Sequence, residues 1–154
     1  MVFHKFSLTD AVTKAIEQKL LAAGYQVEVQ DGPWEKTEDG KYALKKDRLP
    51  QDKVVLVISP RIGGFVADTV VSDYQPTIWI VATLLGKDRS EIYRGFHSTG
   101  WKSKISSERW KYSPPKTTFP NFDALMAKPE QAAIALNESA QLISESVAED
   151  LRRR

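Results

Sequence analysis

The sequence predicts an α+β fold in which two long helices pack on one face of a mainly antiparallel sheet. Apolar residues recur at helical spacing over residues 8–23 and again over 129–151. Between these segments, apolar residues alternate with polar ones or form short runs, as they do in strands. Helices separated from strands in this way favour two layers, with both helices on the same side of the sheet.

The first helix carries a start signal and a stop signal. Ser7 precedes it as a capping residue, and Asp10 lies near its positive end. Gly24 follows and suits a left-handed stop. The apolar positions fall on one face at helical spacing: Leu8, Val12, Ala15, Ile16, Leu20 and Ala23. Residues 25–29 then alternate apolar and polar side chains, which predicts a half-buried strand.

Residues 31–53 are dominated by charged side chains and punctuated by glycine and proline. This composition predicts a surface loop or an irregular hairpin, with Asp39-Gly40 as the turn, and disorder is the alternative.

An almost uncharged stretch follows. Residues 54–58 form an apolar run, which predicts a central strand buried on both faces. Pro60 and the pair Gly63-Gly64 predict a bend or bulge, after which residues 65–71 resume the strand.

Two further strands complete the predicted sheet. Residues 77–85 predict a strong strand, in which side chains face alternately to the two sides of the sheet. Ile78, Ile80, Ala82 and Leu84 face one way, and Thr77, Trp79, Val81 and Thr83 face the other. Residues 91–96 return as an antiparallel partner after a turn.

The end of the chain is helical. Residues 122–126 predict one short helical turn, and Pro129 suits the first position of a long helix. One apolar stripe runs along that helix: Ala132, Leu136, Ala140, Ile143, Val147 and Leu151.

Length and composition favour one globular domain over residues 1–154. The 154 residues are 42% hydrophobic and 27% charged, with a net charge of +2, so no strong field attracts nucleic acid. No cysteine is present, which excludes disulfides and thiolate chemistry.

Catalytic and metal-binding patterns are sparse. His97-Ser98 is the one neighbouring histidine–hydroxyl pair, but adjacent strand residues point to opposite faces. A pocket near Arg61, Asp68 and His97 is the alternative that would support a small-ligand or enzymatic domain. Two histidines and the acids of residues 35–39 do not match known metal-ligand spacings, so we expect no metal, no cofactor and no enzymatic activity.

The segment from Trp101 to Lys116 interleaves cations with aromatic rings. Its candidate partner-binding residues are Trp101, Lys102, Lys104, Arg109, Trp110, Lys111 and Tyr112. Such a segment suits an anionic glycan, a lipid headgroup or a protein surface. The competing interpretation, which we favour, is that the rings pack onto the sheet while the lysines stay solvated. No recognised nucleic-acid motif accompanies it.

Several phrases of the sequence resemble a known group. These phrases are Phe6–Val12, Leu20–Val27, Pro76–Ala82, Glu91–Arg94 and Phe119–Leu125. In their order they resemble small bacterial outer-membrane lipoproteins, similar to TolB amino-terminal-like, curli-assembly or lipopolysaccharide-assembly accessory lipoproteins. The resemblance implies an α+β domain without catalysis that serves assembly or transport. It carries over no functional residue.

The resulting hypothesis is a non-enzymatic accessory or interaction domain of the bacterial envelope. The expected partner is another envelope protein, and the alternative is an anionic glycan or lipid headgroup bound through residues 101–116. The expected location is the periplasm, with a lipid tether upstream of Met1, and the cytoplasm is the alternative.

Overall fold

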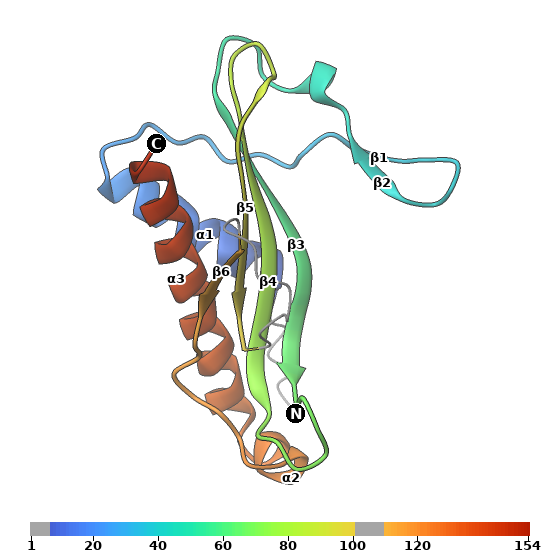
Figure 1. Cartoon of the computed structure of the whole chain (residues 1–154), viewed down its shortest axis with the longest axis vertical. Coiled ribbons are helices and arrows are strands. Elements are labelled where there is room, and N and C mark those ends of the chain that lie inside the picture. The colour runs from blue at the N-terminus through green and yellow to red at the C-terminus, as the bar shows by residue number, and fades with distance from the viewer. Residues whose placement is uncertain (1–6, 101–109) are drawn as a thin grey trace.

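The computed structural model describes residues 7–100 and 110–154 (Figure 1). The described elements, in chain order, are α1 (Leu8–Ala22), β1 (Trp34–Lys36), β2 (Tyr42–Leu44), the 3-10 helix η1 (Lys46–Arg48), β3 (Val55–Val66), β4 (Gln75–Leu85), β5 (Glu91–Thr99), β6 (Trp110–Ser113), α2 (Phe122–Met126) and α3 (Pro129–Arg152). The fold is α+β, with both long helices packed against the sheet, as predicted.

The main sheet has the strand order β3-β4-β5-β6. β3, β4 and β5 pair antiparallel, whereas β6 runs parallel to β5, so the sheet is mainly antiparallel. The prediction that residues 54–58 form a central strand is wrong, because β3 has only β4 as a neighbour among the described strands. Its apolar residues are instead partly covered from the helix side, where Leu56 and Ile58 pack against the core.

β3 is continuous through Pro60, with a register shift between Pro60 and Ile62 that confirms the predicted bulge. The strand ends at Val66, so the predicted strand over residues 65–71 is too long. A turn replaces its last residues, because the Thr69 carbonyl accepts a hydrogen bond from the Ser72 backbone N–H at 3.1 Å.

The helix signals are confirmed. The Ser7 hydroxyl accepts a hydrogen bond from the Asp10 backbone N–H at 3.3 Å, and Gly24 has a φ of +90° after α1. α3 begins at Pro129 as expected.

The core lies between the two helices and the sheet. Its buried residues come from α1, β4, β5 and α3: Val12, Ile16, Ile78, Ile80, Ala82, Tyr93, Ala140, Ile143 and Val147. Gly63 helps α1 to reach the sheet, because a Cβ there would overlap the Leu8 side chain. The residues of the predicted stripe thus hold α3 between α1 and β4.

The connection from α1 to β3 differs from the prediction in one respect. Residues 25–29 form no strand, and residues 26–31 make no backbone hydrogen bond with other described residues. An alternating pattern needs a neighbouring strand to become a sheet, and none of the described strands lies beside it. The charged segment 31–53 forms the β1–β2 hairpin, with Gly40 in its turn at a φ of +80°. The hairpin projects away from the main sheet (Figure 1).

Within the described part of the chain, no helix is both long and apolar enough to cross a bilayer.

Candidate functional site

A chain of four polar side chains links β5 to α3 beneath the helix layer. The Tyr93 hydroxyl lies 2.8 Å from Nε2 of His97 and donates a hydrogen bond of 2.7 Å to Oδ2 of Asp150. Nδ1 of His97 lies 2.8 Å from the Ser146 hydroxyl. We refer to Tyr93, His97, Ser146 and Asp150 as the polar relay. Tyr93, His97 and Asp150 are buried, and Ser146 is partly exposed.

The hydrogen bonds of the relay fix one direction of donation. A carboxylate is only an acceptor, so the single Tyr93 hydroxyl proton points to Asp150. The same oxygen can then accept from Nε2–H of His97. Nδ1 of His97 is left as an acceptor for the Ser146 hydroxyl. Both ring nitrogens of His97 therefore have hydrogen-bond partners within the relay itself.

Gly95 makes this arrangement possible. Tyr93, Gly95 and His97 share one face of β5, and the Tyr93 ring reaches over Gly95 toward His97. A Cβ at Gly95 would overlap the Tyr93 hydroxyl and would lie 2.8 Å from Nε2 of His97.

We therefore expect Gly95→Ala to lower the free energy of unfolding by about 1–3 kcal/mol, because Tyr93 must leave its place in the relay. Urea unfolding monitored by circular dichroism measures the change. Gly24→Ala is not an equivalent control because of its positive φ, so Arg94→Ala, at an exposed site of the same strand, serves as the control for a substitution in β5. A Gly95→Ala protein of unchanged stability would contradict this position of Tyr93.

Burial controls the protonation of the relay. It lowers the pKa of His97 to about 4, which the nearby carboxylate of Asp150 counteracts only in part, and the charge of Lys111 lowers the pKa further. Burial and the hydrogen bond to Asp150 raise the pKa of Tyr93 above its ordinary value. Nζ of Lys111 lies 4.0 Å from Oδ1 of Asp150, and the Arg154 guanidinium lies 5.0 Å from the centre of the Tyr93 ring. At neutral pH His97 is therefore uncharged.

The histidine–hydroxyl pair of the sequence is separated, as strand alternation predicts. His97 faces α3, whereas Ser98 faces the other side of the sheet and accepts a hydrogen bond of 3.1 Å from the Trp110 indole. Arg61, on β3, and Asp68, after β3, are both exposed, while His97 is fully buried and bonded within the relay.

The structure describes the candidate segment from Trp110 onward, and its side chains lie on both faces of the sheet. Trp110 packs on the side away from the helices, with its ring centre 4.9 Å from Trp79 and 5.7 Å from Phe96. Lys111 points to the helix side, toward Asp150, and the Tyr112 hydroxyl donates to the Gly100 carbonyl at 3.2 Å. Trp101, Lys102, Lys104 and Arg109 lie outside the described residues.

A second feature lies at one end of the molecule, where the β3–β4 turn meets α2 (Figure 1). The two segments are joined by the Tyr74–Phe119 backbone bridge and by contact between the Tyr74 and Phe122 rings at 6.0 Å. Four apolar side chains are exposed there: Val70 (104%), Val71 (89%), Phe122 (55%) and Met126 (63%). We call these four residues the apolar tip. Phe122 and Met126 are four residues apart and share one face of α2, while Leu125 turns inward.

Neither feature was anticipated as a site. The relay joins two pairs of residues that lie far apart in sequence, and its only local signal is the spacing of four within each pair, Tyr93 to His97 and Ser146 to Asp150. The tip was hidden because Val70 and Val71 extend an apolar run that resembles a strand. Among the described residues, no group of three or more His, Cys, Asp or Glu side chains converges as metal ligands would.

Comparison with protein-family models, curated proteins and solved structures found no match.

Proposed function

We propose that the chain is a non-enzymatic interaction domain of the bacterial cell envelope, acting as an accessory in assembly or transport. The observation that carries this proposal is the apolar tip. Exposed apolar groups that lie together and contribute little to the core are typical of surfaces that bind another molecule. The resemblance to envelope accessory lipoproteins supports the location, and the expected partner is another envelope protein.

The polar relay supports the non-enzymatic part of the proposal. A general base works best with a pKa near the operating pH, and burial places the pKa of His97 at about 4. Both nitrogens of its ring already have partners inside the protein. The relay is thus better suited to holding α3 on β5 than to activating the Ser146 hydroxyl.

The test uses a bacterial strain that lacks the protein and is assayed for sensitivity to detergent and to large antibiotics that an intact envelope excludes. We expect the deletion to increase sensitivity and the wild-type chain to restore resistance. We expect Ser146→Ala to restore it equally, because this change removes one hydrogen bond worth about 1 kcal/mol and leaves the apolar tip unchanged.

Thermal melting of purified Ser146→Ala serves as the folding control. A folded Ser146→Ala protein that fails to restore resistance would revive the enzymatic alternative. Fractionation to the cytoplasm, together with normal envelope resistance of the deletion strain, would overturn the envelope proposal.

A further inference from the structure

The apex of the β3–β4 connection is a tight turn with valine at both central positions. The Ser72 N–H donates to the Thr69 carbonyl at 3.1 Å, and the Val71 N–H donates to the Thr69 hydroxyl at 3.3 Å. The Thr69 and Ser72 hydroxyls also lie 2.8 Å apart. Glycine, proline, asparagine, aspartate and serine are the residues that favour such positions, each for a conformational reason. Val70 and Val71 thus occupy the apex without any benefit to the turn.

The side chains of these two valines contribute little to the folded protein, because they are almost completely exposed. The hydroxyl and backbone bonds of Thr69 and Ser72 maintain the turn without them. On the adjoining α2, the Asn121 side chain caps the helix by accepting from the Ala124 N–H at 2.8 Å, and the Phe122 ring contacts Tyr74, two residues after the turn. The fold therefore presents an apolar projection, whose shape is complementary to a concave surface.

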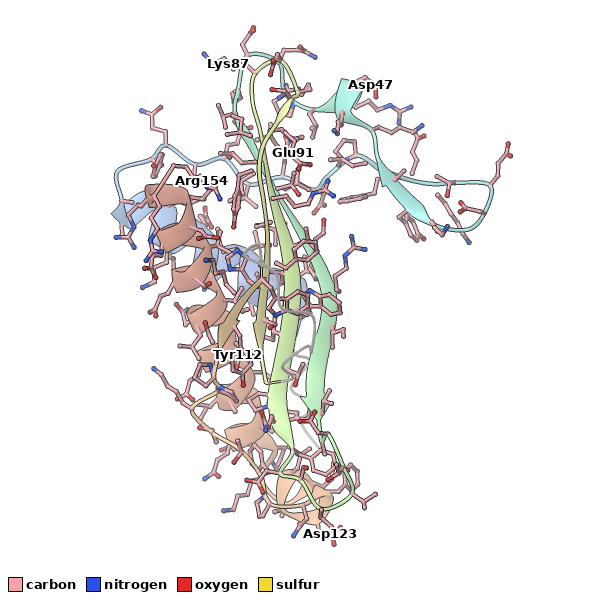
Figure 2. The ribbon with its side chains drawn as sticks, in the orientation of Figure 1. Asp47, Lys87, Glu91, Tyr112, Asp123 and Arg154 are labelled. Carbon is pink, nitrogen blue, oxygen red and sulfur yellow. The ribbon has the colours of Figure 1, made fainter. Side chains whose placement is uncertain are left out.

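Three exposed carboxylates lie close in sequence to this projection, against two exposed cations, Lys116 and Lys128. Asp68 and Asp73 flank the turn, and Asp123 lies on α2 at the extreme end of the molecule (Figure 2). All three side chains are exposed. Such a rim repels an anionic membrane surface, which attracts basic residues. It also opposes the docking of two copies tip to tip, since like charges would meet.

Building on the proposed function, we propose that the apolar tip inserts into a partner protein whose apolar pocket is rimmed by lysine or arginine side chains. Val70 and Val71 fill the pocket, and the adjoining side chains of α2 cover its edge. The carboxylates Asp68, Asp73 and Asp123 face the basic rim, which orients the approach and makes binding weaken as salt increases.

The experiment places a photo-crosslinking benzophenone amino acid at position 71 of the full chain in living cells, with position 42 as the control. Tyr42 is 70% exposed on the β1–β2 hairpin, far along the chain from the tip. We expect an adduct of defined mass from position 71 alone. The crosslinked protein is then purified and titrated with the wild-type chain and three variants at two salt concentrations.

We expect Val70→Ser/Val71→Ser to weaken binding at least ten-fold without changing the melting temperature, and Tyr42→Ser to leave binding unchanged. Asp68→Asn/Asp123→Asn should weaken binding several-fold and reduce its salt dependence. Equal binding by Val70→Ser/Val71→Ser, or salt dependence unaltered by Asp68→Asn/Asp123→Asn, would overturn the inference.

A separate arm measures flotation with vesicles of phosphatidylethanolamine and phosphatidylglycerol. If the wild-type chain floats with the vesicles and Val70→Ser/Val71→Ser does not, the partner of the tip is a lipid surface and not a protein pocket. The absence of any adduct at position 71 would reject the tip as the binding surface, while the envelope phenotype of the deletion strain would still support the proposed function. Adducts at position 71, together with normal envelope resistance of the deletion strain, would support the tip as a binding surface and reject the proposed envelope function.

Discussion

Replacing Ile143 by alanine is expected to lower the free energy of unfolding by about 2–5 kcal/mol. Ile143 is fully buried in the central cluster, on the helix that contacts both α1 and β4. Truncating it removes apolar contacts on two sides and leaves a cavity that the long helix cannot easily close. Leu136→Ala, at another buried position of the same stripe, is expected to act in the same direction. Urea denaturation gives the change directly.

Ile134 offers a matched control on the same helix. It is 57% exposed, so Ile134→Ala is expected to change stability by no more than about 0.5 kcal/mol. If Ile143→Ala melted like Ile134→Ala, the stripe along α3 would be a partner surface instead of core.

Stability is expected to fall by about 3 kcal/mol as the pH decreases from 6.5 to 4, through His97 alone. The pKa of His97 is lowered from an ordinary value of 6.5 to about 4 in the folded protein, mainly by burial. Between these two values the unfolded chain binds a proton that the folded chain does not. The free energy of unfolding therefore increases with pH across this window, and acid favours unfolding.

His97→Gln isolates this contribution, because glutamine keeps a donor and an acceptor but does not titrate in this range. The measurement is the free energy of unfolding from urea denaturation at several pH values between 4 and 7. We expect the wild-type curve to be steeper than the variant curve. Parallel curves would show that His97 is not held neutral, whatever the overall stability of the variant.

The helices could be predicted from the sequence because their signals are local. Ser7, Gly24 and Pro129 mark starts and stops within a few residues of the helices that they bound. The predominantly apolar run of residues 77–85 was equally informative, since β4 has neighbours on both sides and buries one face against the helices. These elements combine a local pattern with the packing that the pattern requires.

The remaining strands depended on partners that a linear pattern does not identify. Residues 25–29 have the right alternation but no described neighbour, while β6 has only four residues and pairs in parallel with β5. Parallel pairing carries no hairpin signal between the strands. The edge position of β3 is likewise a property of strand order, which its apolar composition does not reveal.

The polar relay was unpredictable for a geometric reason. A step of four residues spans about 13 Å along a strand but only about 6 Å along a helix. Tyr93 and His97 can therefore meet Ser146 and Asp150 only because the long tyrosine side chain lies back over Gly95. The contact between the two pairs thus depends on the orientation of the Tyr93 side chain and on the lack of a side chain at Gly95. The structure describes three residues of the candidate segment, Trp110, Lys111 and Tyr112. The sequence identified them as candidates but did not show that they lie on opposite faces of the sheet.

The contact between α1 and α3 constrains when the molecule can fold. Val12 and Ile16 belong to the same cluster as Ile143 and Val147, although almost the whole chain lies between them. During synthesis the sheet strands emerge long before α3, so the first helix and the apolar face of the sheet must wait for the last segment. Contacts of this range close slowly. The central cluster therefore forms only after α3 has been synthesised, and until then the apolar face of the sheet lacks the cover that α3 provides.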